Sequence, residues 1–217
     1  MKYFFIDAKY NKSVILKDSL LKELPKKLGL ITTIQFTNQI LDIKNQLEKL
    51  GHEVYISKGI QKYDGQVLGC ESSAANYIKE DVDAFFYVGT GRFHILNAAM
   101  ETGKKLYSYN PISNQISVLD EKDLEKLKKR RKGALMKYYS SSSIGIIVTT
   151  KPGQNDIKSA FELKEKLRKD GKKAYIFIDN TYNLNSLEDF NFIDSWVNTA
   201  CPRIVEDFSS VNIRDVL

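Results

Sequence analysis

Short apolar runs alternate with amphipathic stretches along most of this chain. The runs at 84–88 (AFFYV) and 144–148 (IGIIV) are continuous, as in strands that are buried on both faces of a parallel sheet. The stretches between such runs have the apolar spacing of helices, and several of them end in glycine, which commonly follows the last turn of a helix. This alternation predicts an α/β protein built from βαβ units with parallel sheets.

The same pattern occurs twice. Residues 29–33 (GLITT) and 145–150 (GIIVTT) are each a predicted strand that ends in a threonine pair. Each strand is followed by a helix that ends in leucine, charged residues and glycine, then by a second and a third strand. The first copy continues into a further helix, strand and charged helix before the second copy begins. In the first copy, the predicted elements after the first strand are a helix ending at 47–51 and strands at 54–56 and 82–88. The extra elements of this copy are a helix at 92–103, strands at 105–109 and 116–119 and a helix at 121–139. In the second copy, the predicted elements are a helix ending at 167–171 and strands at 174–178 and 193–197.

The repeat sets the expected domain organisation. Residues 28–140 form one α/β domain, which carries Cys70, and residues 141–217 form the second, which carries Cys201. Residues 1–27 are a lead-in, with a strand at 3–7 and a helix at 13–26. Because this lead-in resembles the strand and helix at 116–139, we expect it to be the tail of a preceding unit that is absent from the sequence, and its apolar strand to be covered by another chain.

Composition narrows the class of protein. The apolar runs are too short to span a bilayer, and the first residues lack an apolar signal core, so a cytoplasmic protein without disulfides is expected. The net charge of +6 comes largely from residues 122–132. That run fits a solvated helix face best, with a nucleic-acid patch or a docking face for an acidic protein as alternatives. No nucleic-acid-binding motif supports direct contact with nucleic acid.

The chain has only two cysteines, Cys70 and Cys201, and both follow short apolar stretches in predicted loops. Taken alone, each is as consistent with an ordinary thiol as with a functional one. Their neighbours, glycine before Cys70 and proline after Cys201, favour thiols placed for chemistry or metal binding. A cubane iron–sulfur cluster is usually held by more thiolates than two, so a third cysteine would have to come from elsewhere.

Polar residues gather where the predicted strands end, which is where parallel α/β sheets bind ligands. Two glycines around Thr90 can present main-chain N–H groups to an anion, although a tight turn explains them equally well. Lys151 and Arg203 fit either an anion-binding pair or surface charges. The candidate binding residues at these ends are Thr33, Gln35, Gly89, Gly91, Arg92, His94, Thr150, Lys151, Gln154 and Arg203.

Five strings in this order resemble the archaeal diphthamide synthase family, the 2-(3-amino-3-carboxypropyl)histidine synthases. They are GLITTIQ at 29–35, GQVLGC at 65–70, GTGRFH at 89–94, TTKPGQ at 149–154 and VNTACPR at 197–203. The resemblance implies a pseudo-threefold protein of three α/β domains, of which this chain has the second and third. It also implies that one cysteine from each domain holds a [4Fe–4S] cluster, so that Cys70 and Cys201 are metal ligands.

The resemblance further implies a substrate and a partner. S-adenosylmethionine would be cleaved reductively, and its 3-amino-3-carboxypropyl radical would add to a histidine of translation elongation factor 2, the first step of diphthamide formation. An electron donor is then required. The methionine part of S-adenosylmethionine is expected between the two domains, near Thr33, Gln35, Thr150, Gln154 and Arg203.

Two features depart from the family pattern. The first domain and its cysteine are missing, and Ile95 stands where the family tends to have proline. A split gene with a separate first-domain polypeptide, a fragment, and a non-catalytic remnant all fit the first departure. A binding subunit that holds the elongation factor or a partner chain is the alternative function, and a homodimer is a further way to supply the third thiol.

Overall fold

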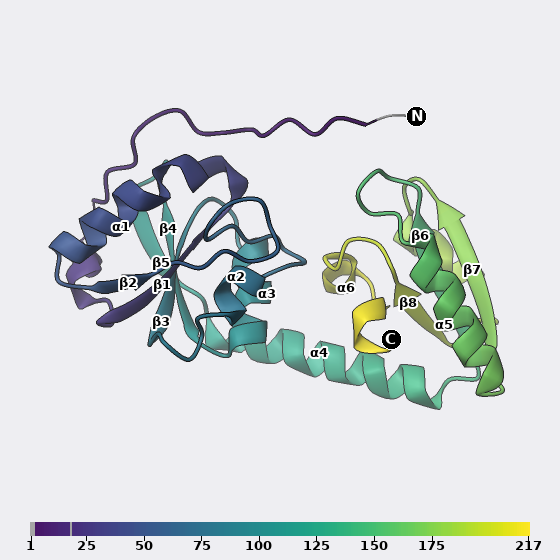
Figure 1. The fold of residues 1–217 in the computed structure, drawn as a ribbon. Helices are drawn as coiled ribbons and strands as arrows, with labels where there is room; N and C mark the ends of the chain where they lie inside the picture. Colours follow the sequence, from purple (N-terminus) through teal and green to yellow (C-terminus); the bar gives the residue numbers. More distant parts are fainter. Residues whose placement is uncertain (1–2, 18) are drawn as a thin grey trace. The chain divides into compact units, whose positions relative to one another are not determined.

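The computed structural model describes residues 3–17 and 19–217, and it divides the chain into two compact units, Met1–Leu124 and Glu125–Leu217 (Figure 1). The division falls inside one helix, α4 (Glu121–Ser140). The α/β class and the parallel sheets predicted from the sequence are confirmed. The domain boundaries expected at residues 27 and 140 remain predictions about how the chain is organised.

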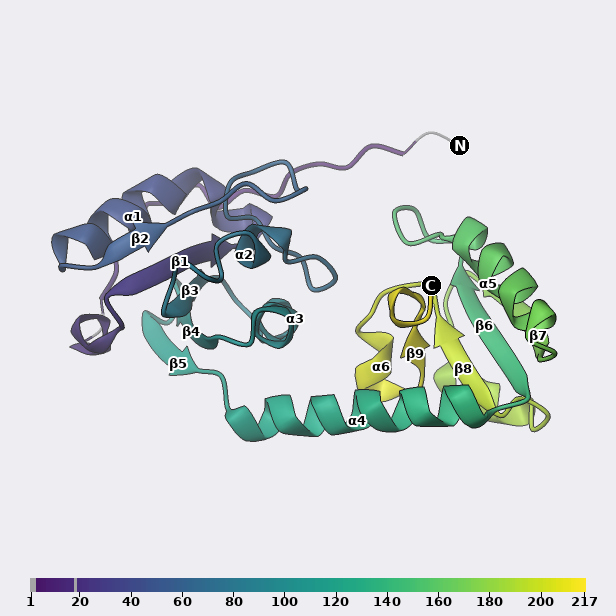
Figure 2. The same ribbon diagram turned by 60° about the horizontal axis from the view of Figure 1, so that its bottom comes forward.

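The first unit is built on a five-stranded sheet with the order β2-β1-β3-β4-β5. Strands β1 to β4 are parallel, and β5 runs antiparallel to β4 at one edge. Helix α1 covers one face of the sheet, and α2 and α3 cover the other (Figure 2). The elements in chain order are η1 (Ser19–Glu23), β1 (Lys27–Thr32), η2 (Ile34–Gln39), α1 (Ile40–Lys49), β2 (Glu53–Tyr55), α2 (Ser73–Asn76), β3 (Ala84–Val88), α3 (Phe93–Thr102), β4 (Lys105–Asn110) and β5 (Gln115–Val118).

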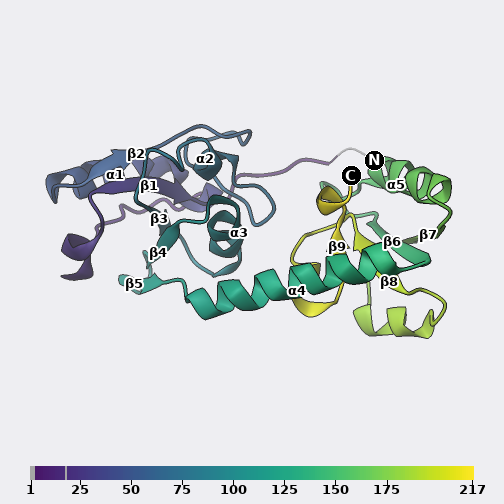
Figure 3. The same ribbon diagram turned by 90° about the horizontal axis from the view of Figure 1, so that it is seen from below.

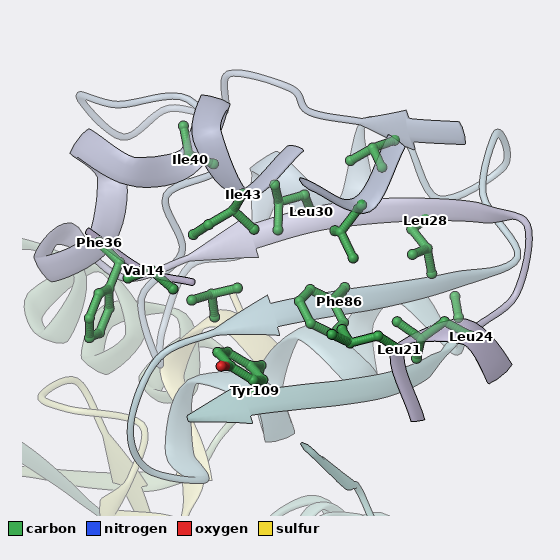
Figure 4. Packing of buried hydrophobic residues seen from close by; sticks show 14 residues of the cluster. Val14, Leu21, Leu24, Leu28, Leu30, Phe36, Ile40, Ile43, Phe86 and Tyr109 are labelled. Carbon is green, nitrogen blue, oxygen red and sulfur yellow. The ribbon is translucent and has the colours of Figure 1, made fainter. Parts of the chain in front are cut away.

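Alternation along the central strands fills two cores. Leu28, Leu30 and Phe86 point to the α1 side, where they pack with Ile43 and other apolar side chains (Figure 4). Ile31 and Phe85 point to the side of α2 and α3. A strand of this kind needs apolar residues on both faces, which is why β3 appears in the sequence as an unbroken apolar run.

The second unit is a four-stranded parallel sheet with the order β7-β6-β8-β9. Helix α5 and the 3-10 helix η3 lie on opposite faces of this sheet (Figure 3). The face beside η3 is covered by aromatic side chains that pack around Trp196. The elements are β6 (Ser143–Thr149), α5 (Ile157–Lys169), β7 (Lys173–Asp179), η3 (Leu184–Asp189), β8 (Ser195–Asn198), α6 (Ile204–Asp207), β9 (Val211–Asn212) and η4 (Ile213–Asp215).

The two sheets repeat one packing detail that no run of apolar residues reveals. Gly29 in β1 is opposite Phe85 in β3, and Gly145 in β6 is opposite Trp196 in β8. In each sheet the aromatic ring lies over the glycine, so closely that an added Cβ atom would be 2.4 Å from a ring carbon. Glycine is therefore required at this position in both units because the neighbouring ring occupies the space of a side chain.

The predicted lead-in strand at 3–7 is wrong. These residues have no strand partner in the described part of the chain, and Phe4 and Ile6 are 88% and 92% exposed. The predicted helix at 13–26 is also wrong, because the described residues of this range form only η1. Val14 and Leu24 instead pack in the core beside α1, so this segment belongs to the first unit by contact. Tertiary burial has overridden the weak helical spacing here.

Candidate functional site

Both sheets have a point where the strand order reverses, and these points concentrate the polar residues. In the first unit it lies between β1 and β3, and in the second between β6 and β8. Open α/β sheets bind ligands at the carboxyl ends of strands that flank such a reversal. The loops that follow β1, β3, β6 and β8 therefore form the candidate sites, one in each unit.

The loop that carries Cys70 follows β2 but returns to the end of β1. Gln66 forms a parallel bridge with Thr32. The Thr32 N–H donates to the Gly65 carbonyl at 2.8 Å, and the Thr32 carbonyl accepts from the Val67 N–H at 2.9 Å. The Thr32 hydroxyl donates to the Val88 carbonyl of β3 at 2.7 Å. Thr32 thus joins β1, β3 and this loop, and it brings Cys70 to the strand reversal.

Cys70 lies in a tight turn closed by Leu68 and Glu71. These two residues form an antiparallel bridge, with the Leu68 N–H donating to the Glu71 carbonyl at 2.8 Å. The Phe93 ring packs directly on Gly69, where an added Cβ would be 1.6 Å from a ring carbon. The Cys70 side chain is half-buried and is not in a disulfide.

Buried polar atoms without hydrogen-bond partners surround the Gly89–Gly91 turn. They are the hydroxyls of Thr33 and Tyr87, which lie near one another without hydrogen-bond geometry, and the Nδ1 atom of His94; none of the three makes a hydrogen bond among the described residues. The Tyr87 oxygen lies directly beneath Gly89, and the Tyr87 and His94 rings stack at 6.5 Å. Buried polar groups are normally paired, so these atoms indicate a place where a ligand or an ordered water supplies the missing partners.

Burial also sets the protonation of this cluster. It raises the pKa of Tyr87 to about 12, an effect that the nearby Thr33 side chain partly offsets, so the phenol remains a hydrogen-bond donor. Burial lowers the pKa of His94, so its ring is neutral at pH 7 and offers one donor and one acceptor.

The Cys201 loop directly follows β8 and is shaped by one side chain, Asn198. Its amide nitrogen donates to the Cys201 carbonyl at 2.9 Å and to the Asn212 side chain at 3.3 Å, and its amide oxygen accepts from the Ala200 N–H at 2.9 Å. Asn198 is 1% exposed. The Cys201 side chain is half-buried and, like Cys70, is outside any disulfide.

The loop after β6 is tied to the loop after β7. The Thr149 hydroxyl donates to the Asn180 carbonyl at 3.0 Å, and the Thr150 hydroxyl donates to the Asn180 side chain at 3.3 Å. Gly153 has a φ of 77°, a conformation that favours glycine. Gln154 is exposed in this turn, and Lys151 is half-buried.

The structure brings some predicted residues together and separates others. Thr33, Gly89, Gly91 and His94 share one strand reversal, and Thr150, Lys151 and Arg203 follow the two strands that flank the other. Gln35 is exposed in η2, and Arg92 forms an ion pair with Asp123 at the start of α4. An Arg92 side chain held in this way is less available to a ligand than the sequence suggested.

Sequence reasoning missed four residues that shape these loops: Thr32, Tyr87, Asn198 and Glu71. Glu71 is 8% exposed, and its Oε1 accepts from the Ser73 N–H at 2.6 Å, while Oε2 has no partner in the described part of the chain. Only its position beside Cys70 could have drawn attention to it. Thr32 and Asn198 lie in strings that the sequence analysis quoted, but their hydrogen bonds across the sheet were not predicted, and Tyr87 looks like an ordinary strand residue.

The described part of the chain offers two separate thiols, Cys70 and Cys201, as candidate metal ligands. No group of three or more His, Cys, Asp or Glu side chains gathers there as a metal site. Two half-buried thiols on hydrogen-bonded loops are suitable iron–sulfur ligands, but they complete only part of a cluster's ligand set. Shared ligation of one cluster by Cys70 and Cys201 stays a prediction. No helix of the described residues is both long and apolar enough to cross a membrane.

Comparison with known proteins supports the resemblance. The sequence profile of the diphthamide synthesis protein family matches residues 1–210. The chain is 32% identical, over 209 residues, to the 2-(3-amino-3-carboxypropyl)histidine synthase of Pyrococcus horikoshii, which covers 94% of this chain and 59% of that protein. It is 33% identical to subunit 1 of the corresponding synthase from Schizosaccharomyces pombe, over 95% of this chain and 48% of that protein.

A solved structure gives the same result for the fold. The crystal structure of Dph2 from Pyrococcus horikoshii with a 4Fe–4S cluster superposes with a TM-score of 0.76 and 31% identity, over 90% of this chain and 57% of that one. The chain thus spans about half to three fifths of the length of these relatives. Because the family profile matches nearly the whole sequence, this chain belongs to the diphthamide synthesis protein family.

Proposed function

We propose that this chain provides two cluster ligands and the substrate-binding loops of a 2-(3-amino-3-carboxypropyl)histidine synthase. The reaction transfers the 3-amino-3-carboxypropyl group of S-adenosylmethionine to a histidine of translation elongation factor 2 in the cytoplasm. The names of the relatives and the cluster in the Pyrococcus horikoshii structure support this proposal. The observation that carries it within this chain is that each unit holds one half-buried cysteine on a loop fixed at the carboxyl end of its sheet.

In this proposal Cys70 and Cys201 are two thiolate ligands of a [4Fe–4S] cluster. A third thiolate comes from residues outside this sequence, either on a first-domain polypeptide or on another copy of the chain. When bound, the cluster supplies the electron for reductive cleavage of the sulfonium carbon–sulfur bond, and an external electron donor replaces that electron. The fixed loops keep each thiol at its place before metal is bound, which lowers the ordering cost of ligation.

The chain's own polar groups serve the substrate. Gly91 leaves room for a ligand to approach the main chain, whereas the Tyr87 side chain fills the space beside Gly89. The buried hydroxyls of Thr33 and Tyr87 are the groups proposed to donate to that ligand. A neutral His94 avoids repelling the sulfonium and ammonium charges of S-adenosylmethionine. In the second unit, Thr150, Gln154 and the cations Lys151 and Arg203 suit the substrate's carboxylate.

Anaerobic reconstitution tests the cluster ligands. The chain alone should bind substoichiometric iron that a chelator removes quickly, because two thiolates leave irons without protein ligands. Co-expression with the part of the Pyrococcus horikoshii protein that this chain does not match should raise iron and sulfide toward four of each per assembly. Cys70→Ser or Cys201→Ser should abolish that gain.

A relocated thiol provides the matched control. Ser142 is exposed at the opposite end of β6 from the Cys201 loop. The double variant Cys201→Ser/Ser142→Cys keeps the number of thiols unchanged but moves one away from the site. A stable four-iron cluster in this variant, or in Cys201→Ser, would refute the assignment of Cys201 as a ligand.

A further inference from the structure

The two sides of the Cys70 turn are attached to the first unit in different ways. Before the cysteine, residues 65–67 are hydrogen-bonded to Thr32 at the end of β1. After the cysteine, the chain enters α2 (Ser73–Asn76), a helix of only four residues. So short a helix is not stable by itself, and its position depends on the groups that it contacts. The contacts that hold α2 therefore also hold the far side of the Cys70 turn.

The loop after β2 holds one side of α2. The Ser57 hydroxyl donates to the Ala74 carbonyl at 2.5 Å, and the Ile60 N–H donates to the Ser73 hydroxyl at 2.9 Å. Gly59 lies so close to α2 that an added Cβ atom would be 2.2 Å from the Ser73 hydroxyl oxygen. This side of α2 is thus closed by the loop, and its other neighbour is α3, with which it shares one face of the sheet (Figure 2).

The Glu101 carboxylate connects α2 to α3. It lies in the last turn of α3, where it accepts a hydrogen bond from the Ser72 hydroxyl and a second from the Asn76 side chain at 2.7 Å. Asn97, one turn earlier, donates from Nδ2 to the Ser72 hydroxyl at 3.2 Å and to the Glu101 Oε1 atom at 3.1 Å. Hydrogen bonds to a carboxylate are stronger than those between neutral groups, so Glu101 is the principal acceptor of this network.

The same face of α3 follows the Cys70 turn along its length. Phe93, Asn97 and Glu101 are spaced by four residues and therefore share a face of the helix. The Phe93 ring packs on Gly69, directly before the cysteine, whereas Asn97 and Glu101 bind Ser72, which is 1% exposed and comes shortly after it. Helix α3 thus contacts the turn on both sides of the thiol.

We propose that Glu101 is a positioning residue for Cys70, because its carboxylate clamps α2, and with it the Cys70 turn, to α3. The inference rests on the proposed function, in which Cys70 is a thiolate ligand. Glu101 acts through Ser72 and Asn76, which it binds directly. Because α3 begins just after the Gly89–Gly91 turn, the same helix holds the thiol and the main-chain groups that would meet the substrate in one fixed arrangement.

The reactivity of the Cys70 thiol tests the clamp on the full chain without metal. In a Cys201→Ser background, Glu101→Ala should raise the rate of reaction with an aromatic disulfide reagent about tenfold, because the loss of hydrogen bonds to a charged group makes local opening easier. Glu101→Gln should stay within about threefold of the parent, since its amide oxygen still accepts hydrogen bonds. Circular dichroism checks that each variant is folded.

Glu48→Ala is the matched control. Glu48 is an exposed glutamate in α1 of the same unit, and its carboxylate forms an ion pair with Lys44 at 3.6 Å. Its removal should leave the Cys70 rate unchanged. An unchanged rate in Glu101→Ala, an equal increase in Glu48→Ala, or a rate in Glu101→Gln as high as that in Glu101→Ala would each overturn the proposal.

A double-mutant cycle tests whether Glu101 acts through Ser72. Ser72→Ala should also raise the Cys70 rate, and Ser72→Ala/Glu101→Ala should raise it by less than the product of the two single effects, because both changes break one contact. A full product would overturn this route. Failure of the proposed function is a separate result, in which the complete assembly holds no cluster although the Cys70 rates still follow the Glu101 variants.

Discussion

The two cysteine loops hold their thiols by different means. The Cys70 loop leaves β2, returns to β1 and is fixed by main-chain hydrogen bonds through Thr32 and by a turn in which Gly69 lies against Phe93. The Cys201 loop follows β8 directly and depends on the side chain of Asn198. The two are also at different places in the repeat, since one follows a second strand and the other a third. A similar location has thus been reached from two topological origins, one through the backbone and one through a single side chain.

Gly65→Ala should have the largest effect on this comparison. Gly65 has a φ of 65°, and an added Cβ would be 2.3 Å from the Ile40 side chain and 3.0 Å from the Leu30 carbonyl. The free energy of unfolding should fall by about 3 kcal/mol, because backbone strain adds to a steric conflict. Urea unfolding followed by circular dichroism measures it.

Gly91→Ala is the matched control for that variant. Its φ of 86° carries the same kind of strain, but nothing lies within 4 Å of an added Cβ. Its cost should be about 1 kcal/mol. Equal losses in the two variants would show that the close contacts of Gly65 do not hold the Cys70 loop.

Asn198→Ala should have the second-largest effect, and it should act on the Cys201 loop alone. It removes a buried amide that makes three hydrogen bonds, so the cost should be about 2 kcal/mol. In a Cys70→Ser background the thiol of Cys201 should also react faster with a thiol reagent, because its loop is released. In a Cys201→Ser background, Asn198→Ala should leave the reaction rate of the Cys70 thiol unchanged. An unchanged Cys201 rate would mean that the loop is fixed by contacts other than Asn198.

Thr32→Val and Thr199→Val should have smaller and similar effects. The Thr32 hydroxyl donates to the Val88 carbonyl, and the Thr199 hydroxyl donates to the Ile147 carbonyl at 2.9 Å, so each ties together the strands at one reversal. Valine preserves the shape, and each loss should be about 1 kcal/mol. Amide exchange in the strand pairs β1–β3 and β6–β8 locates it. A loss of stability in only one of the two variants would show that the two hydroxyls do not have equivalent roles in the two units.

Acid should produce the smallest effect, at the contact that attaches the N-terminal segment to the first unit. The Tyr63 hydroxyl, at 2.5 Å, and the Lys62 ammonium hold the pKa of Asp7 below its ordinary value of 3.8. A depressed pKa means that this attachment of the N-terminal segment is complete above pH 3.8 and is lost as the pH falls through the lowered value. Chemical shifts of residues 8–10 should follow that titration, and Asp7→Asn should abolish it. A midpoint at or above 3.8 would contradict the contact.

The sequence was sufficient to predict structural features that repeat or that depend on a continuous pattern of apolar residues. The parallel strands, the helices that end in glycine and the loops of both cysteines follow from apolar runs and from the two copies. The prediction of a strand in the lead-in was wrong, because Tyr3 to Ile6 have the composition of a strand but no strand partner among the described residues. The roles of Thr32 and Asn198 could not be predicted, because they arise from hydrogen bonds to residues that are distant in the sequence and adjacent only in the folded sheet.

Trp196 has a practical consequence beyond its packing on Gly145. It is the only tryptophan of the chain, it is buried, and its ring contacts belong to the second unit. Its fluorescence therefore reports the unfolding of Glu125–Leu217, whereas the emission of the first unit comes from tyrosines. Excitation at the red edge of the absorption band isolates the tryptophan. The second unit thus carries its own optical probe, and its transition can be separated from that of its neighbour without any label.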